Sequence, residues 1–298
     1  MERTTLWNGL GINVNDCRTS EEVMEKAGLD WTVSKKPLIW EGKTNRFYTI
    51  TRDDNNDLLG IVKGNYKPVQ NVEMFSFVDE LIPEGVSYEK VGISKDGSRI
   101  WLLSKMPETT ILGDNFDPYI VFTTTHDGTA SAKACITPVR VACQNTLNLA
   151  FKNASRKWSF RHSNNINIKI EEAKQTFLST NNYMNCLKSE IEELAMIKVS
   201  PQKFNYLANE LFPIKENTTS KKEEEQLLLR DTLKEAYMAD DLGNLKGTAW
   251  GVLNAVSDMA MHRKLRTGSD ENSYTNRMLN IAEFGETTLD KAYAILSK

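Results

Sequence analysis

The stretch SYEKVGISKDGSRIWLL, residues 87–103, decides the fold class of this 298-residue chain. Two runs of strand-forming residues, Ser87–Ile93 and Ser98–Leu103, lie on either side of Asp96-Gly97. An Asp-Gly pair between two such runs is typical of the tight turn that joins antiparallel strands. The stretch therefore predicts a β-hairpin.

Four more segments around this hairpin are rich in β-branched or aromatic residues, and turn signals separate them in pairs. These predicted strands cover residues 46–51, 58–62, 119–125 and 130–136. Two helices are predicted before the hairpin. One begins at Thr19-Ser20-Glu21-Glu22 and ends at Gly28, and the other covers residues 72–81, where Phe75 and Val78 lie three apart.

From Pro138 onward the pattern changes to helix, and Pro138 itself suits a first helical turn. The predicted helices cover residues 138–157, 168–196, 200–211, 222–240, 247–265 and 274–296. A sheet followed by helices predicts an α+β fold, with an antiparallel sheet and helices in the N-terminal half and a mostly helical C-terminal half. We divide the chain into a sheet-plus-helix core, residues 1–165, and a helical region, residues 166–298, which pack as one unit or stand apart.

Composition narrows the class of protein. Apolar residues make up 40% of the chain and charged residues 26%, as in ordinary globular proteins, and the net charge is −3. We find no apolar run long enough to cross a bilayer, and Met1–Leu10 lacks the apolar centre of a signal peptide, so we expect a cytoplasmic protein without a membrane partner. The four cysteines are scattered without a CxxC pair, which predicts reduced thiols. Since no Gly-rich phosphate loop follows a strand, we expect no cofactor.

The residues after Pro138 carry the strongest binding signal. On a helix, polar side chains would recur every four residues beside an apolar stripe, and eight basic residues but only two acidic ones lie between Ser131 and Lys174. Cations interleaved with aromatic residues suit a single strand of nucleic acid, whose bases stack on rings. The predicted nucleic-acid ligands are Arg140, Gln144, Asn148, Lys152, Arg156, Lys157, Trp158 and Arg161. The alternative is a solvated helix face whose aromatic rings pack inward.

Three other groups each have two interpretations. His126-Asp127 is a metal or catalytic pair, or else a turn with a hydrogen-bonded histidine. The chain holds only three histidines, without HxH or HExxH spacing, which favours the turn.

A set of residues four apart on one predicted helix forms either a polar site or a hydrogen-bond network between helices. That set is Trp250, Asn254, Asp258 and His262. The loop Lys63–Asn71 contacts a phosphate or simply connects a strand to a helix. No nucleophile lies at helical spacing near these groups, so we assign no catalytic residue and no metal.

These motifs resemble a known family. The segments that carry the resemblance are Ala27-Gly28-Leu29-Asp30-Trp31, Tyr66-Lys67-Pro68-Val69-Gln70-Asn71, Thr125-His126-Asp127-Gly128, Arg140-Val141-Ala142-Cys143-Gln144-Asn145-Thr146-Leu147, the helix with Trp250, Asn254 and His262, and Lys291–Leu296. They are similar to the phage- and plasmid-borne proteins of domain of unknown function 932. The resemblance implies a mobile-element protein in a bacterial cytoplasm and supplies no reaction. The order of elements also resembles the core of single-strand-annealing proteins of the Red beta and Erf superfamily, which implies a homo-oligomer.

Three functions from different classes follow. The first is a nucleic-acid-binding protein that binds single-stranded DNA and promotes annealing or recombination. The second is an inhibitor that binds a host defence or replication protein through the helical half, including Glu223-Glu224-Glu225. The third is a metal-dependent hydrolase, which lacks the carboxylate cluster that two-metal phosphate chemistry needs. The first two are not enzymes, and we favour them over the third.

Overall fold

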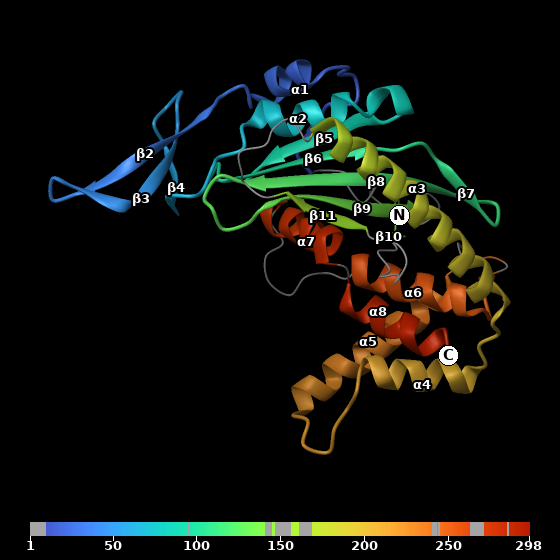
Figure 1. Cartoon of the computed structure of the whole chain (residues 1–298). Coiled ribbons are helices and arrows are strands. Elements are labelled where there is room, and N and C mark those ends of the chain that lie inside the picture. Colours follow the sequence, from blue (N-terminus) through green and yellow to red (C-terminus); the bar gives the residue numbers. More distant parts are fainter. Residues whose placement is uncertain are drawn as a thin grey trace.

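The computed structural model shows a curved antiparallel sheet with helices on both faces and a separate three-stranded sheet at one end (Figure 1). It describes residues 10–94, 96–140, 145–146, 156–160, 169–239, 243, 245–262, 271–284 and 286–298. Within these residues the predicted α+β class is confirmed: strands dominate the N-terminal half and helices the C-terminal half. No helix in the described parts of the chain is both long and apolar enough to cross a membrane.

The larger sheet holds the predicted hairpin at its centre. Its strands are β1 (Ile12–Asn13), β5 (Ser87–Ile93), β6 (Arg99–Lys105), β7 (Thr109–Ile111), β8 (Asp114–Thr125), β9 (Ala132–Arg140), β10 (Asn145–Thr146) and β11 (Lys157–Phe160). The order is β1-β5-β6-β8-β9, with β10 and β11 both paired to β9 and β7 paired to β8. The hairpin is β5–β6, in which Ile93 pairs with Ile100 across the Asp96-Gly97 turn.

Both faces of the larger sheet are covered, and side chains alternate between them. On one face, Ile100 and Leu102 join the core beneath α1 (Ser20–Ala27) and α2 (Asn71–Asp79). On the other face, Trp101 and Leu103 pack with α7 (Glu271–Phe284). Burial in both directions explains why β6 reads as a continuous apolar run.

The first helix begins and ends as the sequence predicts. The Thr19 hydroxyl accepts a hydrogen bond from the backbone N–H of Glu22 at 3.3 Å, which satisfies one of the free N–H groups of the first turn. Gly28 ends the helix in the left-handed conformation, with φ at 63°, which a residue without Cβ adopts at low cost. The 3-10 helix η1 (Ile82–Glu84) ends in the same way at Gly85.

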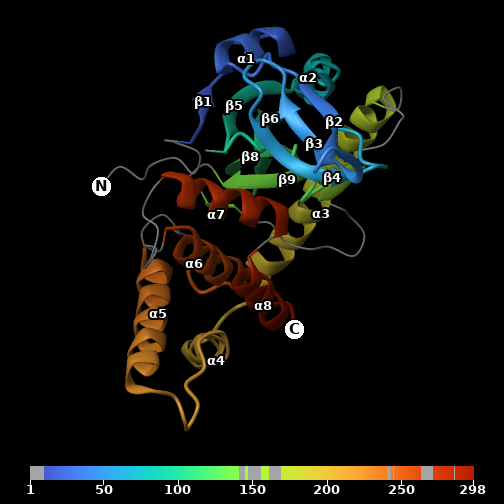
Figure 2. The ribbon, with the colours of Figure 1, turned by 90° about the vertical axis from the view of Figure 1, so that its left-hand side faces the viewer.

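The helices of the C-terminal half pack around their own core below the sheet (Figure 2). They are α3 (Lys169–Met196), α4 (Pro201–Leu211), α5 (Ser220–Met238), α6 (Ala249–His262) and α8 (Thr287–Leu296). This core also includes Ile111, Phe116 and Ile136 of the sheet, and the Trp250 ring lies 6.4 Å from the Phe116 ring. The helical half therefore shares a hydrophobic core with β7, β8 and β9.

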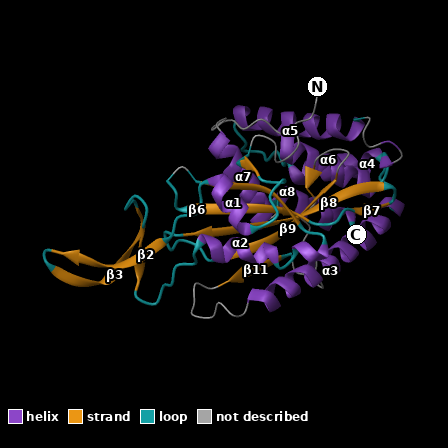
Figure 3. Ribbon diagram, turned by 90° about the horizontal axis from the view of Figure 1, so that it is seen from above, coloured by secondary structure: helices purple, strands orange, loops and turns teal. Residues whose placement is uncertain are grey.

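A second sheet extends away from the body (Figures 1 and 3). It contains β2 (Val33–Trp40), β3 (Lys43–Arg52) and β4 (Leu58–Lys63) in that order. We call residues 33–63 the arm. Its first turn has positive φ at both Glu41 (49°) and Gly42 (75°), the geometry that joins two twisted strands most tightly.

The helix predicted over residues 138–157 is wrong where the structure describes it. β9 continues through Pro138 to Arg140, and β11 begins at Lys157. Pro138 lies opposite Pro118 of β8. Because both lack an N–H, they can face each other only where the two strands exchange no hydrogen bonds, so the strand continues.

Two smaller differences concern the last predicted helix and three short or irregular strands. The helix predicted over residues 274–296 is two helices, α7 and α8, because the Glu286 carboxylate accepts from the N–H of Leu289 at 2.9 Å and starts a new helix. The strands β1, β2 and β7 are outside the set that the sequence predicts. β2 contains Pro37, and a proline within a run of residues weakens the prediction of a strand, so the sequence pattern did not indicate β2.

Candidate functional site

Three of the sequence motifs meet in one buried group at the base of the arm. His126 is fully buried, and its Nε2 lies 3.0 Å from Oδ1 of Asn71. The Asn71 amide donates to the carbonyls of Leu29 and Trp31 at 2.9 and 3.2 Å. Because both donations come from the amide nitrogen, Oδ1 is the acceptor and His126 carries its proton on Nε2. We call Trp31, Asn71 and His126 the base cluster.

The base cluster also packs through its rings. The Trp31 and His126 rings meet edge to face with centroids 5.4 Å apart, and the Arg52 guanidinium lies 4.2 Å from the Trp31 ring centroid. Trp31 precedes β2, and Arg52 ends β3. The cluster therefore joins the first two strands of the arm to the turn after β8.

Hydrogen bonds fix the start of the arm to α2. The Gln70 side chain accepts from the N–H of Val33 at 3.0 Å and donates to its carbonyl at 2.9 Å, as a neighbouring strand would. The Tyr66 hydroxyl donates to the Thr125 carbonyl at 2.9 Å. Burial raises the pKa of Tyr66 well above its usual range, so this hydroxyl stays protonated and keeps its donor.

β4 lies directly on the Asp127-Gly128 turn. A Cβ at Gly60 would lie 2.4 Å from Cα of Asp127, and a Cβ at Gly128 would lie 2.7 Å from the Val62 side chain. β4 and this turn approach so closely only because both positions are glycine. The sequence interpretation of His126-Asp127 as a structural turn thus matches its role here, which is to seat the arm.

The arm has one face that carries cations and exposed apolar side chains. Residues paired across an antiparallel sheet share a face, and Trp40 pairs with Lys43, Phe47 with Lys63, and Lys36 and Ile61 both with Thr49. The arm face is Lys36, Trp40, Lys43, Phe47, Thr49, Ile61 and Lys63. Trp40 is 68% exposed and Ile61 is 53% exposed. Within residues 33–63, all of them described, no strand residue on this face is Asp or Glu.

The opposite face of the arm is used internally near the body. Ile50 and Val62 are buried in the main core. The Lys35 ammonium donates to the carbonyls of Gly64 and Tyr66 and lies 4.3 Å from the Tyr48 ring centroid. Lys35 is held by these contacts, whereas Lys36, Lys43 and Lys63 of the arm face are exposed.

A pocket of about 500 Å³ lies where the arm face meets the body. Its lining residues are Phe47, Ile61, Val62, Lys63, Asn65, Tyr66 and Gly128. An aromatic ring and an ammonium group at the mouth of one hollow suit a flat, apolar group that carries a negative charge.

A family model for a domain of unknown function, DUF932, matches residues 58–280, which is 223 of the 298 residues. The chain belongs to the DUF932 family. The match includes β4, Asn71 and His126, whereas β2, β3 and Trp31 precede it. The comparisons with curated proteins and with solved structures gave no match.

The predicted nucleic-acid ligands fall in the DUF932 match, and those that the structure describes lie on or next to strands rather than on one helix. Arg156 is a correction: its side chain is 8% exposed and donates to the carbonyl of Ala282, so it cannot meet a phosphate in solvent. Lys157 is exposed on β11, and Trp158 is half-buried between the two main cores. Arg140 is described only as the last residue of β9. The other four, Gln144, Asn148, Lys152 and Arg161, lie outside the described residues.

The predicted polar set on α6 is partly internal to the helix. The Asn254 amide donates to the Trp250 carbonyl at 2.9 Å, and each of these residues is 1% exposed. Asp258 is half-buried, and the side chain of His262 lies outside the described residues. Among the described residues no group of three or more His, Cys, Asp and Glu could hold a metal ion.

A second group of cations lies on the face of the sheet that α7 covers. Arg99 of β6 pairs with Thr125 of β8, and Lys133 of β9 pairs with Thr123 of β8. On its other side, Lys133 pairs with Ser159 of β11. Since Lys157 and Ser159 are two apart on β11, Arg99, Lys133 and Lys157 all point to this face. Glu283, in the last turn of α7, lies among them. We call Arg99, Lys133, Arg156, Lys157 and Glu283 the α7 cluster.

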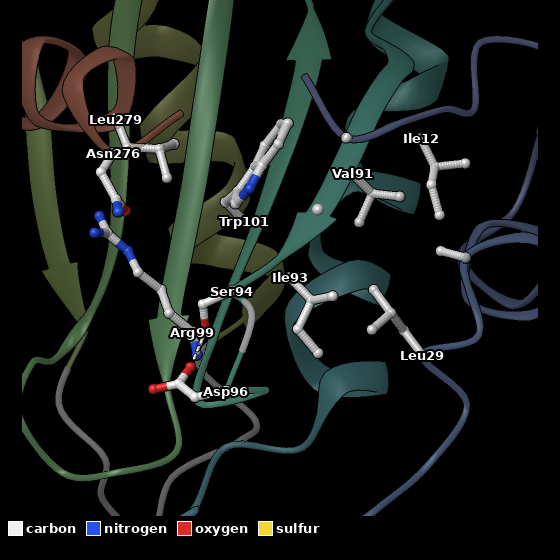
Figure 4. A pocket seen from close by; sticks show the side chains of 13 residues that line it. Ile12, Leu29, Val91, Ile93, Ser94, Asp96, Arg99, Trp101, Asn276 and Leu279 are labelled. Atoms are coloured by element: carbon white, nitrogen blue, oxygen red, sulfur yellow. Dashed lines mark hydrogen bonds between the residues drawn. The ribbon is translucent and has the colours of Figure 1, made fainter. Parts of the chain in front are cut away.

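Beside the α7 cluster, a largely apolar pocket of about 790 Å³ opens between β1, β5 and α7 (Figure 4). Trp101 lies at its centre, and the indole packs directly on the backbone of β5 at Gly92. A Cβ at Gly92 would lie only 2.4 Å from the indole, so glycine is needed there. Arg99 reaches from the polar end of the pocket toward Asn276 of α7. Arg99 thus lines this pocket and also pairs with Glu283.

The sequence analysis missed most of the arm face. Of its cations only Lys63 belonged to a loop that we considered for phosphate contact. A usable signal was present: Glu41-Gly42 is a turn pair between two runs in which lysines and apolar residues mix. The face itself depends on the register of three strands, which no local pattern specifies.

Proposed function

We propose that this DUF932 protein binds single-stranded nucleic acid along the arm face. The observation that carries the proposal is a solvent-exposed sheet face with Lys36, Lys43 and Lys63 and no acidic strand residue. Asp53, in the turn after β3, interacts electrostatically with Lys36. Lysines neutralise phosphates without reading sequence. Trp40 on the same face offers an exposed ring for a base, and the half-buried Phe47 ring already carries the Arg46 guanidinium 5.1 Å from its centroid.

The mixture of charge and apolar surface favours a single strand over a duplex. A duplex presents its phosphates outward and keeps its bases stacked, so exposed rings gain little from it. A single strand brings both groups to the same surface. The edge of the arm is a poor site for a protein strand, since β2 carries Pro37 and the lysines that block strand addition.

The resemblance to phage and plasmid proteins completes the proposal. On such an element, single-stranded DNA arises in replication and recombination, and a binding protein in the bacterial cytoplasm would protect it or promote annealing. A homo-oligomer would place several arms on one strand, which raises affinity through effective concentration.

Salt-dependent binding tests the proposal. The anisotropy of a labelled oligonucleotide of about 20 thymidines should rise with protein, and affinity should fall steeply between about 50 and 200 mM salt. Changing Lys36, Lys43 and Lys63 together to alanine should weaken binding and reduce the salt slope by about 2, since each phosphate contact on a single strand contributes about 0.7.

A control triple variant distinguishes an effect of the arm face on binding from an effect of the net charge. Lys215, Lys221 and Lys222 are exposed before and at the start of α5, far along the chain from the arm. Their replacement by alanine changes the net charge equally and should leave affinity and slope near those of the parent. Equal losses in both triple variants, or no salt-sensitive binding in the parent, would overturn the proposal.

The inhibitor of a host protein remains a second candidate because α5 exposes apolar residues. Leu227 is 45% exposed and Leu228 is 66% exposed, next to Glu223, Glu224 and Glu225. Adjacent exposed leucines with an acidic border suit a protein partner better than a phosphate chain. A host protein retained after nuclease treatment by the parent, and lost on changing Leu228 to lysine, would support this candidate.

A further inference from the structure

The α7 cluster contains more positive than negative charge. Its cations are Arg99, Lys133, Arg156 and Lys157, and the carboxylate within it is Glu283. Two other carboxylates act on it from a distance: Asp127 on Arg99 and Asp290 on Arg156. Among the described residues this is where cations from three strands of the sheet converge.

Glu283 holds two of these cations at once. One carboxylate oxygen pairs with Nη2 of Arg99 at 3.3 Å, and the other pairs with Nζ of Lys133. The Glu283 side chain is 8% exposed, whereas Arg99 and Lys133 are each 23% exposed. The carboxylate thus faces inward, and the cations reach solvent around it.

The end of α7 adds to this arrangement. Arg156 donates to the Ala282 carbonyl, one residue before Glu283, where the helix dipole is negative. Burial lowers the pKa of Lys133, and the charges of Arg99 and Lys157 lower it further. An anion at this place offsets the repulsion among the cations, and Glu283 now supplies that anion.

We propose that the α7 cluster is a second phosphate-binding site, in which Glu283 occupies the place of the phosphate and competes with it. This inference rests on the proposed function, because the phosphates concerned are those of the bound single strand. The oxygens of a dianionic or bridging phosphate can accept hydrogen bonds from the forked guanidinium of Arg99 and from the ammonium groups of Lys133 and Lys157. The turn after β8 links this site to the arm, since Gly128 lines the arm pocket and Ser131 bonds to Ser159 beside Lys157.

Removing the competing charge should strengthen binding. The substitution Glu283→Gln keeps the shape of the side chain and removes the negative charge that pairs with Arg99 and Lys133. Affinity for the thymidine oligonucleotide should rise about threefold or more, and the salt slope should steepen by about 0.7 for one added phosphate contact. Adding Lys133→Ala to this variant should return both values to those of the parent.

Inorganic pyrophosphate distinguishes this inference from the proposed function. With ionic strength matched by potassium chloride, about 1 mM pyrophosphate should raise the Tm of Glu283→Gln more than that of the parent, and Lys133→Ala should abolish the gain. If the arm variants bind DNA normally while pyrophosphate still stabilises Glu283→Gln, the arm proposal fails and the phosphate site stands. If Glu283→Gln, correctly folded, gains neither DNA affinity nor pyrophosphate stabilisation, the inference is wrong.

Lys157→Ala provides a second test if Glu283→Gln does not fold. Lys157 is exposed, so its loss should not affect folding. The inference expects Lys157→Ala to weaken oligonucleotide binding about threefold with a shallower salt slope. Affinity equal to that of the parent would overturn it.

Discussion

His126 donates a hydrogen bond to Asn71 across 55 residues of sequence, with 3.0 Å between Nε2 and Oδ1. The same amide binds the carbonyls of Leu29 and Trp31, so one side chain connects three segments of the chain. All of these groups are buried, and water cannot replace a lost partner. The base cluster therefore controls how the arm is held to the sheet.

Changing Asn71 to alanine should destabilise the protein strongly. The change leaves the His126 N–H and two backbone carbonyls without partners, and each buried unsatisfied group costs about 1–3 kcal/mol. We expect the free energy of unfolding to fall by about 3 kcal/mol or more in urea titration. The exposed Asn209 of α4 is the matched control, and its change to alanine should alter stability by less than about 0.5 kcal/mol. A similar small effect for both variants would contradict the importance of the base cluster.

Gly60→Ala should loosen the arm, because its Cβ would meet the Asp127 backbone at 2.4 Å. We expect a loss of about 1–3 kcal/mol in unfolding free energy, and faster cleavage by limited proteolysis within residues 33–63. Gly64→Ala lies on the same segment, where the Cβ would meet only the Tyr48 ring at 3.5 Å, an ordinary contact. Cleavage of the arm at equal rates in the two variants would show that the close contact at Gly60 does not matter.

Arg156→Ala should impair folding rather than act as a loss of a surface charge. The guanidinium is buried and holds the end of α7 through the Ala282 carbonyl, so its removal leaves that carbonyl unpaired. The expected loss of stability is about 1–3 kcal/mol by urea titration. The neighbouring Lys157, which is exposed, provides the comparison, and Lys157→Ala should unfold like the parent. If Arg156→Ala keeps full stability, the buried placement of the guanidinium is wrong.

Trp40→Ala should weaken nucleic-acid binding through lost stacking. A ring that stacks on one base contributes about 1–3 kcal/mol, so affinity for the thymidine oligonucleotide should fall at least about fivefold, and Trp40→Phe should restore part of it. Ile39 is 63% exposed and precedes Trp40 on the opposite face of the arm. Ile39→Ala should therefore bind as the parent does. Equal losses at the two positions would indicate a general role of the tip rather than stacking on one face.

Stability should depend on pH through Glu89 of β5. Burial raises the pKa of Glu89, with Asp117 adding to the rise and Lys105 and Lys90 opposing it. The folded state therefore binds a proton more tightly than the unfolded state, and stability falls as pH rises from the unfolded pKa through the raised folded pKa. Glu89→Gln carries no such charge, so its Tm relative to the parent should be higher near pH 7 than near pH 4. The same Tm difference at both pH values would contradict the raised pKa.

Local sequence patterns determined much of the fold. Asp96-Gly97 between two apolar runs specified the β5–β6 hairpin, and the Thr19 cap with Gly28 specified α1, because turns and caps depend on the conformational freedom of a few adjacent residues. The motifs around Asn71 and His126 lie within the family match and marked the family correctly, whereas the Trp31 motif precedes the match. Their local patterns did not show that they meet at one place.

Only the tertiary structure decided which residues form a surface. The four-residue period after Pro138 fitted a helix, but burial of Ile136 and Val139 on opposite faces of the sheet keeps the chain in a strand as far as Arg140. Arg156 became an internal donor, and Lys36, Lys43 and Lys63 came together only through pairing across the arm. The physical reason is that strand pairing joins residues far apart in sequence, and its free energy comes from contacts that no single segment contains.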